Sequence, residues 1–253
     1  MNTGLPPCSF LCGVQRLTCP FWTSECPIER FYLYHLCVME KNIAILMADL
    51  SGYTALTETH GAVAAADLID RYIGIVKSCL IGDSHLHERT GDEIMVISSS
   101  PDSLLATAVM IGKHISNEDN FLQVHGGLHY GKALKRANSY FGSAINLTSR
   151  IAAKATAGSV WCSDEFINAL TDKSGVTMRS KGNQGFKNVS IEKEVFELCI
   201  ENRESVYIDP ICRMLILEPG KAMSHTTENG KYFCSSDCLA IYNSKDAART
   251  TSG

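Results

Sequence analysis

A single carboxylate, Asp49, ends the apolar run of residues 43–48 and is followed by the small-residue turn 51–54. This order predicts a buried strand that carries Asp49 to the edge of a sheet, with free backbone N–H groups in the turn behind it. The arrangement suits a polyphosphate bound to Mg²⁺, because Mg²⁺ prefers oxygen ligands and commonly shares the phosphates of a substrate. The alternative role for Asp49 is that of an N-cap on the helix that follows.

Further polar groups occur at spacings that could also serve chemistry. Asp92 lies at the turn of a hairpin predicted over residues 85–97. Asn146 and Arg150 are four positions apart in a helix predicted over residues 141–155, which places both side chains on one face. The chain therefore offers a second carboxylate and an amide paired with a guanidinium group.

Three cysteines near the C-terminus form a separate pattern, because Cys212, Cys234 and Cys238 are separated by 21 and 3 residues. A module of this size can hardly bury enough core to fold alone, so a bound Zn²⁺ or Cu⁺ would stabilise it. Three thiols leave a fourth ligand open, for which His225, Asp209, water or nothing are the options. The alternative is that the three thiols only pack in a small core.

The composition sets the class of protein that these groups belong to. The chain has 253 residues, a hydrophobic fraction of 45% and a net charge of −4, which is ordinary for a globular protein of one or two domains. This charge gives no reason to expect a nucleic-acid partner, and no apolar run approaches the ~20 residues of a membrane span. Eleven cysteines without a secretory signal favour a reducing compartment, so we expect a cytoplasmic protein.

The elements that must position these groups predict an α+β fold in which helices cover a mixed sheet. We expect an amphipathic helix over residues 62–80, a helix over 101–115 that is capped by Ser100, and a glycine-bearing strand over 121–131. The remaining strands are expected over residues 160–162, 176–180 and 194–200.

Four motifs in this order resemble those of the class III adenylyl and guanylyl cyclase catalytic domain, over residues 42–200. Residues 48–54 are similar to the first metal motif of that family and residues 90–92 to the second. Residues 124–131 resemble its central strand, and residues 140–150 resemble its Asn-x-x-x-Arg helix. The resemblance implies a ferredoxin-like sandwich that converts a nucleoside triphosphate into the 3′,5′-cyclic nucleotide and pyrophosphate.

The resemblance also implies a role for each matched residue. Asp49, Asp92 and the backbone carbonyl of Leu50 are expected to hold two Mg²⁺ or Mn²⁺ ions per active site. Arg150 is expected to neutralise charge on the transferring phosphate and Asn146 to orient the ribose. The remaining substrate-binding residues are expected to be Gly52, Tyr53, Thr54 and Lys187, although Lys187 could equally be a solvated surface lysine.

A homodimer follows from the same resemblance. In this family the metal-binding carboxylates come from one subunit and the Asn/Arg pair from the other, and this chain carries both sets. We therefore expect two equivalent sites related by C₂ symmetry.

Two positions depart from the adenylyl pattern of the family. Glu88 stands where the adenine-reading lysine is expected, and Ser139 stands in place of its Asp partner. Arg89 is adjacent to Glu88, but strand alternation points it to the opposite face. A carboxylate accepts hydrogen bonds from both guanine donors but would face the lone pair of adenine N1, and guanylyl members also carry Glu here. We therefore expect GTP to be favoured over ATP; the alternative is that Glu88 is only a strand residue in a degenerate base pocket.

Composition and the resemblance together divide the chain into five segments. Residues 1–38 hold four of the seven prolines and show no periodicity, so we expect a disordered extension or a mis-assigned start before Met39. The catalytic domain is expected over residues 39–200. The linker is expected over residues 201–206, the cysteine module over 207–245 and a disordered tail over 246–253.

Residues 207–245 resemble a YHS (TRASH-like) domain, which implies one Zn or Cu ion on Cys212, Cys234 and Cys238 and regulation of the cyclase by this module. Two alternatives remain, namely an adenylyl cyclase with an atypical base pocket and a catalytically inactive dimeric metal sensor. The presence of all four matched catalytic residues favours the enzyme.

Overall fold

The computed structural model describes residues 40–174, 176–200, 206–226 and 230–250. The chain divides into two units, Met1–Val38 and Met39–Gly253, and every described residue belongs to the second unit. The expectation of a disordered or mis-assigned segment at residues 1–38 therefore lies outside the described residues. Within the described part, no helix is both long enough and apolar enough to cross a membrane.

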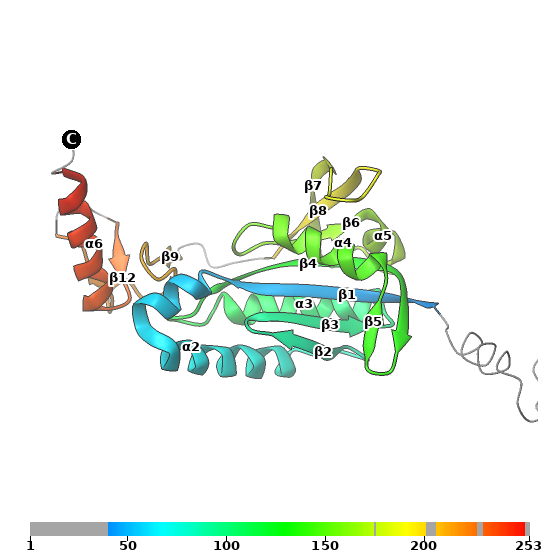
Figure 1. The fold of residues 1–253 in the computed structure, drawn as a ribbon, viewed down its shortest axis with the longest axis horizontal. Helices are drawn as coiled ribbons and strands as arrows, with labels where there is room; N and C mark the ends of the chain where they lie inside the picture. The colour runs from blue at the N-terminus through cyan, green and yellow to red at the C-terminus, as the bar shows by residue number, and fades with distance from the viewer. Residues whose placement is uncertain (1–39, 175, 201–205, 227–229, 251–253) are drawn as a thin grey trace, which may run out of the picture. The chain divides into compact units, whose positions relative to one another are not determined.

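An eight-stranded mixed sheet forms the centre of the second unit (Figure 1). The strands are β1 (Glu40–Ser51), β2 (His85–Thr90), β3 (Glu93–Ser98), β4 (Gln123–Arg136), β5 (Ser139–Phe141), β6 (Val160–Ser163), β7 (Thr177–Gln184) and β8 (Lys193–Cys199). They follow the order β2-β3-β1-β4-β6-β8-β7, with β5 paired to β4. Among the described strands only β4 and β6 pair in parallel, so the expectation of a mixed sheet is confirmed.

Helices cover both faces of this sheet, which explains why β1 is apolar at almost every position. On one face, Leu46 and Ala48 of β1 pack with α2 (Tyr53–Ser78) and α3 (Pro101–Ile115). On the other face, Ile45 and Met47 cluster with residues of α4 (Ser143–Lys154). A short helix, α5 (Asp164–Ala169), follows β6.

Local sequence signals account for several of these boundaries. The Oγ of Ser100 accepts a hydrogen bond from the N–H of Ser103 at 3.2 Å, so the predicted cap of α3 is confirmed. The predicted stripe of residues 62–80 is buried as expected. However, α2 already begins at Tyr53, and Gly61 (φ 84°, ψ 171°) breaks it into two segments, so the periodicity revealed only the second one.

The close approach expected at the glycines of the central strand is also present. A Cβ added to Gly127 of β4 would lie 2.5 Å from the backbone N of Ala152 and 2.7 Å from the carbonyl O of Thr148. Both neighbours belong to the backbone of α4, so only glycine lets this helix lie directly on the strand.

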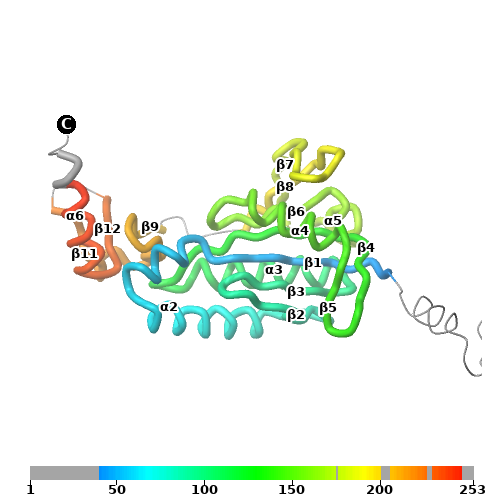
Figure 2. Tube along the Cα trace, in the orientation of Figure 1, coloured from blue at the N-terminus to red at the C-terminus, as the bar shows by residue number. Residues whose placement is uncertain are grey.

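The C-terminal residues form a small module of short strands and one helix (Figure 2). Strand β9 (Tyr207–Ile208) pairs with β10 (Leu215–Ile216), and β11 (Met223–Ser224) pairs with β12 (Tyr232–Phe233). The helix α6 (Ser236–Thr250) begins after β12 and extends through residues 246–250. The expectation of a disordered tail is therefore wrong for these residues. Cys212, Phe233 and Cys238 form the buried centre of the module.

Candidate active site and cysteine cluster

Asp49 and Asp92 come from neighbouring strands and approach each other. Asp49 lies near the end of β1, Asp92 lies in the turn between β2 and β3, and the β1–β3 ladder ends close by at the pair Ala48↔Ile94. Burial, followed by the hydrogen bond and charge of Asp49, raises the pKa of Asp92 to about 6. Among the described residues, neither carboxylate forms an ion pair with Lys or Arg. This uncompensated set of oxygen ligands fits a divalent cation such as Mg²⁺ or Mn²⁺.

The turn behind Asp49 has the free backbone donors that the sequence predicted. Gly52 is the N-cap of α2 with φ 100°, and no side chain caps the helix. The alternative role of Asp49 as this cap is therefore wrong; its Oδ1 accepts the N–H of Leu50, at 3.0 Å. The first N–H groups of α2, around Tyr53 and Thr54, have no partner within the helix and can face an anion.

His125 is a neighbour of this site for which sequence reasoning assigned no role. It lies opposite Asp49 in the β1–β4 ladder, and its Nδ1 is 2.9 Å from the Oγ of Ser51. Burial lowers its pKa, while Asp92 and Glu93 act in the opposite direction. Only the register of β4 against β1 could have revealed this position.

Asn146 and Arg150 lie on α4, four residues apart. Asn146 is exposed and Arg150 is half-buried, and neither has an ion pair among the described residues. The helix packs over Gly131 and Gly127 of β4, whereas Asp49 pairs further along that strand. The sharing of the site between two chains therefore stays a prediction.

A β-bulge decides which face Glu88 occupies. Leu86 pairs with Val96 and Glu88 pairs with Met95, so His87 is the extra residue of β2. Glu88 therefore shares the α4 side of the sheet with Met95. Arg89 pairs with Ile94 on the opposite side, as strand alternation predicted.

The same bulge brings β2 close to β5. The ring of His87 lies 4.9 Å from the ring of Tyr140, which is the residue after Ser139. Glu88 and Ser139, the neighbours of these two rings in sequence, are both exposed; their role in reading the base stays a prediction.

Lys187 is exposed in the loop between β7 and β8, next to the buried Phe186. No ion pair of Lys187 is present within the described residues. This position agrees with a solvated lysine and leaves its triphosphate-binding role a prediction.

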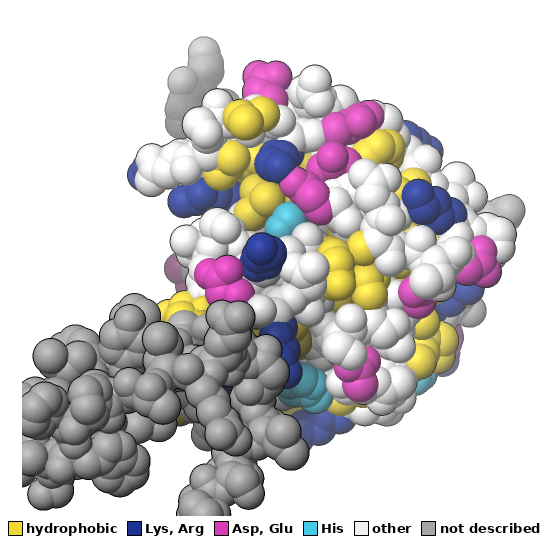
Figure 3. All heavy atoms as spheres, turned by 90° about the vertical axis from the view of Figure 1, so that its right-hand side faces the viewer, with side chains coloured by type: hydrophobic (Ala, Val, Ile, Leu, Met, Phe, Trp, Pro, Cys, Tyr) yellow, Lys and Arg dark blue, Asp and Glu magenta, His cyan; other side chains and the backbone are white. Residues whose placement is uncertain are grey.

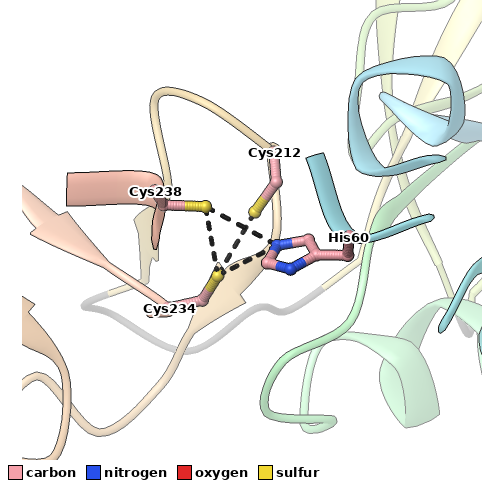
Figure 4. Close-up of side chains that lie close together, drawn as sticks. All are labelled: His60, Cys212, Cys234 and Cys238. Atoms are coloured by element: carbon pink, nitrogen blue, oxygen red, sulfur yellow. Dashed lines mark hydrogen bonds between the residues drawn. The ribbon is translucent and has the colours of Figure 1, made fainter. Parts of the chain in front are cut away.

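The three C-terminal cysteines come together, and a histidine from α2 joins them (Figure 4). The Sγ of Cys234 lies 3.4 Å from that of Cys212 and 3.6 Å from that of Cys238. The Nε2 of His60 lies 3.5 Å from the Sγ of Cys234 and 3.6 Å from that of Cys238. All four ligand atoms lie within 4.8 Å of one another.

His60 takes the place for which we had considered other residues. The carboxylate of Asp209 is buried and accepts hydrogen bonds from the N–H groups of Ile211, Cys212 and Cys234. His225 lies 3.1 Å from the Oδ1 of Asn243. Neither residue belongs to the cluster, and His60 was missed because it lies far away in the sequence, on a helix with no metal-binding spacing.

A family model described as the adenylate and guanylate cyclase catalytic domain matches residues 38–196. A pH-sensitive adenylate cyclase of Mycobacterium tuberculosis is 29% identical over 132 residues, which are 52% of this chain and 33% of that protein. An uncharacterized protein of the same organism is 34% identical over 126 residues, 49% of this chain and 33% of that protein. The chain thus spans about a third of the length of these curated relatives.

Solved structures with this fold include adenylyl cyclases and guanylyl cyclases. The adenylyl cyclase CyaB from P. aeruginosa has a TM-score of 0.57 at 20% identity, covering 66% of this chain and 98% of that one. The guanylyl cyclase Cya2 has a TM-score of 0.56 at 20% identity, covering 66% of this chain and 96% of that one. These likenesses concern the fold. The matched family model ends at residue 196, so the resemblance of residues 207–245 to a YHS domain stays a prediction.

Proposed function

Because the chain belongs to the family of adenylate and guanylate cyclase catalytic domains, we propose that it converts a nucleoside triphosphate into its 3′,5′-cyclic nucleotide and pyrophosphate. The observation that carries this proposal is the meeting of Asp49 and Asp92 beside the uncapped N-terminus of α2. Two carboxylates without a basic partner suit Mg²⁺ or Mn²⁺, and the free N–H groups suit the phosphates that such ions accompany.

The residues divide the work of an in-line displacement. The ribose 3′-oxygen attacks the α-phosphorus and loses its proton, and the bond from that phosphorus to the leaving pyrophosphate breaks. When bound by Asp49, Asp92 and the Leu50 carbonyl, two metal ions would lower the pKa of the 3′-hydroxyl and neutralise the phosphates. Arg150 would donate hydrogen bonds to the transferring phosphate, and Asn146 would hold the ribose.

We further propose that two chains complete each site. Among the described residues Arg150 of α4 forms no ion pair, so its guanidinium group is available to a substrate held by the carboxylates of a second chain. Phe141, at the end of β5 beside this helix, is 51% exposed. The end of the domain where β5 lies carries hydrophobic side chains among charges of both signs (Figure 3), a surface suited to a second copy.

A mixing experiment tests the shared site. Asp49→Ala and Arg150→Ala chains should each be inactive or nearly so, with a loss on the order of 10²-fold or more for Arg150→Ala. Mixed together, they should recover about a quarter of the wild-type rate, because half of the dimers are then mixed and each of these has one intact site. Asp49→Ala mixed with Asp92→Ala is the control, since both sites of that mixed dimer lack a carboxylate. A mixture of Asp49→Ala and Arg150→Ala that forms mixed dimers yet stays as inactive as this control would refute the shared site.

GTP is our proposed substrate, because Glu88 can accept hydrogen bonds from both donors of the guanine edge and Ser139 can donate to its O6. Both side chains are exposed in the free chain; once a bound base covers them, a polar group left unpaired by the wrong base can discriminate by up to about 10⁴-fold. The relative that is named an adenylate cyclase is an argument for ATP instead. Purified chain with Mn²⁺ and each nucleoside triphosphate should form cyclic GMP faster than cyclic AMP, and Glu88→Lys with Ser139→Asp should reverse this order. Faster cyclic AMP formation by the wild-type chain would show that ATP is the substrate.

We also propose that Cys212, Cys234 and Cys238 bind one Zn or Cu ion and that the module regulates the cyclase. The three sulfur atoms lie within 4.8 Å of one another, which suits a single soft ion. Loss of one metal ion per chain in Cys234→Ser would support this assignment.

A further inference from the structure

The C-terminal module is hydrogen-bonded to the segment that leads into β4, the strand that pairs with β1. The N–H of Leu215 in β10 donates to the carbonyl of Phe121 at 2.6 Å, and the N–H of Asn120 donates to the carbonyl of Leu215 at 3.0 Å. The N–H of Leu217 donates to the Oδ1 of Asp119 at 2.9 Å. Main-chain hydrogen bonds therefore hold the module to the segment that leads into β4.

A second contact lies directly on the turn after Asp49. A Cβ placed on Gly52 would be 2.5 Å from the Cβ of Arg213, so the side chain of Arg213 covers this glycine. Arg213 has a φ of 69°, in the left-handed region, and follows Cys212 of the cluster. The cluster and the catalytic turn are thus in contact through one residue.

The third contact is His60, at the other end of the first segment of α2. Residues 53–60 run from Gly52 to the break at Gly61 and form a helical segment about 12 Å long. The segment begins at the catalytic turn and ends at His60, whose imidazole meets the three sulfurs (Figure 4). An ion held at His60 would therefore fix the far end of this segment, while Arg213 covers its near end.

The spacing of the four ligand atoms fits a tetrahedral ion such as Zn²⁺. For tetrahedral Zn²⁺, bond lengths of about 2.3 Å to sulfur and about 2.0 Å to nitrogen place ligand sulfurs about 3.8 Å apart and sulfur and nitrogen about 3.5 Å apart. The observed values are 3.4 and 3.6 Å between sulfurs and 3.5 and 3.6 Å from His60 to two sulfurs. A closed set of three thiolates and one imidazole is typical of a structural zinc site.

We propose that His60 of the catalytic domain completes a Cys₃His zinc site with Cys212, Cys234 and Cys238, and that this ion clamps the module to the helix that follows the catalytic turn. Asp209 supports the site, because its buried carboxylate binds the N–H groups of Cys212 and Cys234 and so fixes two ligands. In this arrangement the conformational order of residues 53–60 depends on the bound metal. The clamp rests on the metal site proposed above for the three cysteines, and the catalytic domain supplies its fourth ligand.

Metal content of the full chain tests the assignment of His60. His60→Ala and Cys238→Ser should each lower the bound zinc by one ion per chain or weaken it at least 10-fold, whereas His60→Cys should restore it as a Cys₄ site. His225→Ala and Cys199→Ser are matched controls outside the cluster and should keep the wild-type zinc content. If Cys238→Ser loses the ion while His60→Ala keeps it with wild-type affinity, the three-cysteine site stands and the bridging role of His60 is refuted.

Spectroscopy and hydrogen exchange give readouts that do not depend on cyclase activity. The Co²⁺-substituted chain should show the intense visible bands of a tetrahedral site with thiolate ligands, and these should change in His60→Ala but not in His225→Ala. Removal of zinc by a chelator should speed amide exchange in residues 53–60 and leave α3 unchanged. Unchanged exchange in residues 53–60 after zinc has left would overturn the clamp, and copper in place of zinc in the purified chain would overturn the assignment of the ion.

Discussion

Gly52 meets two constraints at once, and replacing it with alanine should reveal both. Its φ of 100° strains any residue with a Cβ, at a cost of about 1–2 kcal/mol. The new Cβ would also lie 2.5 Å from the Cβ and 2.8 Å from the Cγ of Arg213. Overpacking of this kind costs about 1–3 kcal/mol more, so Gly52→Ala should lower the free energy of unfolding by about 2–5 kcal/mol in total.

Two variants separate the contributions. Gly182 also has a positive φ, of 72°, but has nothing within 4 Å of an added Cβ, so Gly182→Ala should show the backbone cost alone. Arg213→Gly removes the clashing side chain and suits the φ of 69° at that position. In urea unfolding followed by circular dichroism, the double variant Gly52→Ala/Arg213→Gly should recover the overpacking cost, with a coupling energy of about 1–3 kcal/mol. If Gly52→Ala loses no more stability than Gly182→Ala and shows no coupling energy with Arg213→Gly, the contact of Arg213 with the catalytic turn is refuted.

Further predictions concern the core. Burial lowers the pKa of His129 to about 4, with Glu165 opposing and Lys193 reinforcing the shift. The folded state therefore favours the neutral ring. The free energy of unfolding should fall by about 3 kcal/mol as the pH drops from above 6.5 towards 4. His129→Phe should lose less between these pH values in urea titrations, and an unchanged pH slope would refute the assignment. Gly127→Ala should lower the melting temperature because its Cβ meets the backbone of α4. Gly74→Ala, inside α2 with open space around it, should raise stability by about 0.5–1 kcal/mol, and a fall in melting temperature for Gly74→Ala would contradict the open site.

The sequence by itself determined the features that depend on neighbours along the chain. The cap Ser100, the hairpin turn at Gly91 and Asp92 and the buried stripe of α2 follow from turn chemistry and helical period, and all are present in the structure. The order of the four motifs was sufficient for the family, which the match over residues 38–196 shows. The substrate and the roles of Asn146 and Arg150 stay predictions, because they concern a ligand and a second chain.

Only the tertiary structure decided which distant groups meet. Nothing in the local pattern around His60 indicates a ligand, and its contact with Cys238 spans 178 positions of sequence. The bulge at His87, which turns Glu88 to the α4 side, depends on the register of β2 against β3. The contact of Arg213 with Gly52 requires the module to fold back on the sheet. Periodicity reports which face of an element is buried, whereas these pairs arise from packing between elements, which no short window of sequence contains.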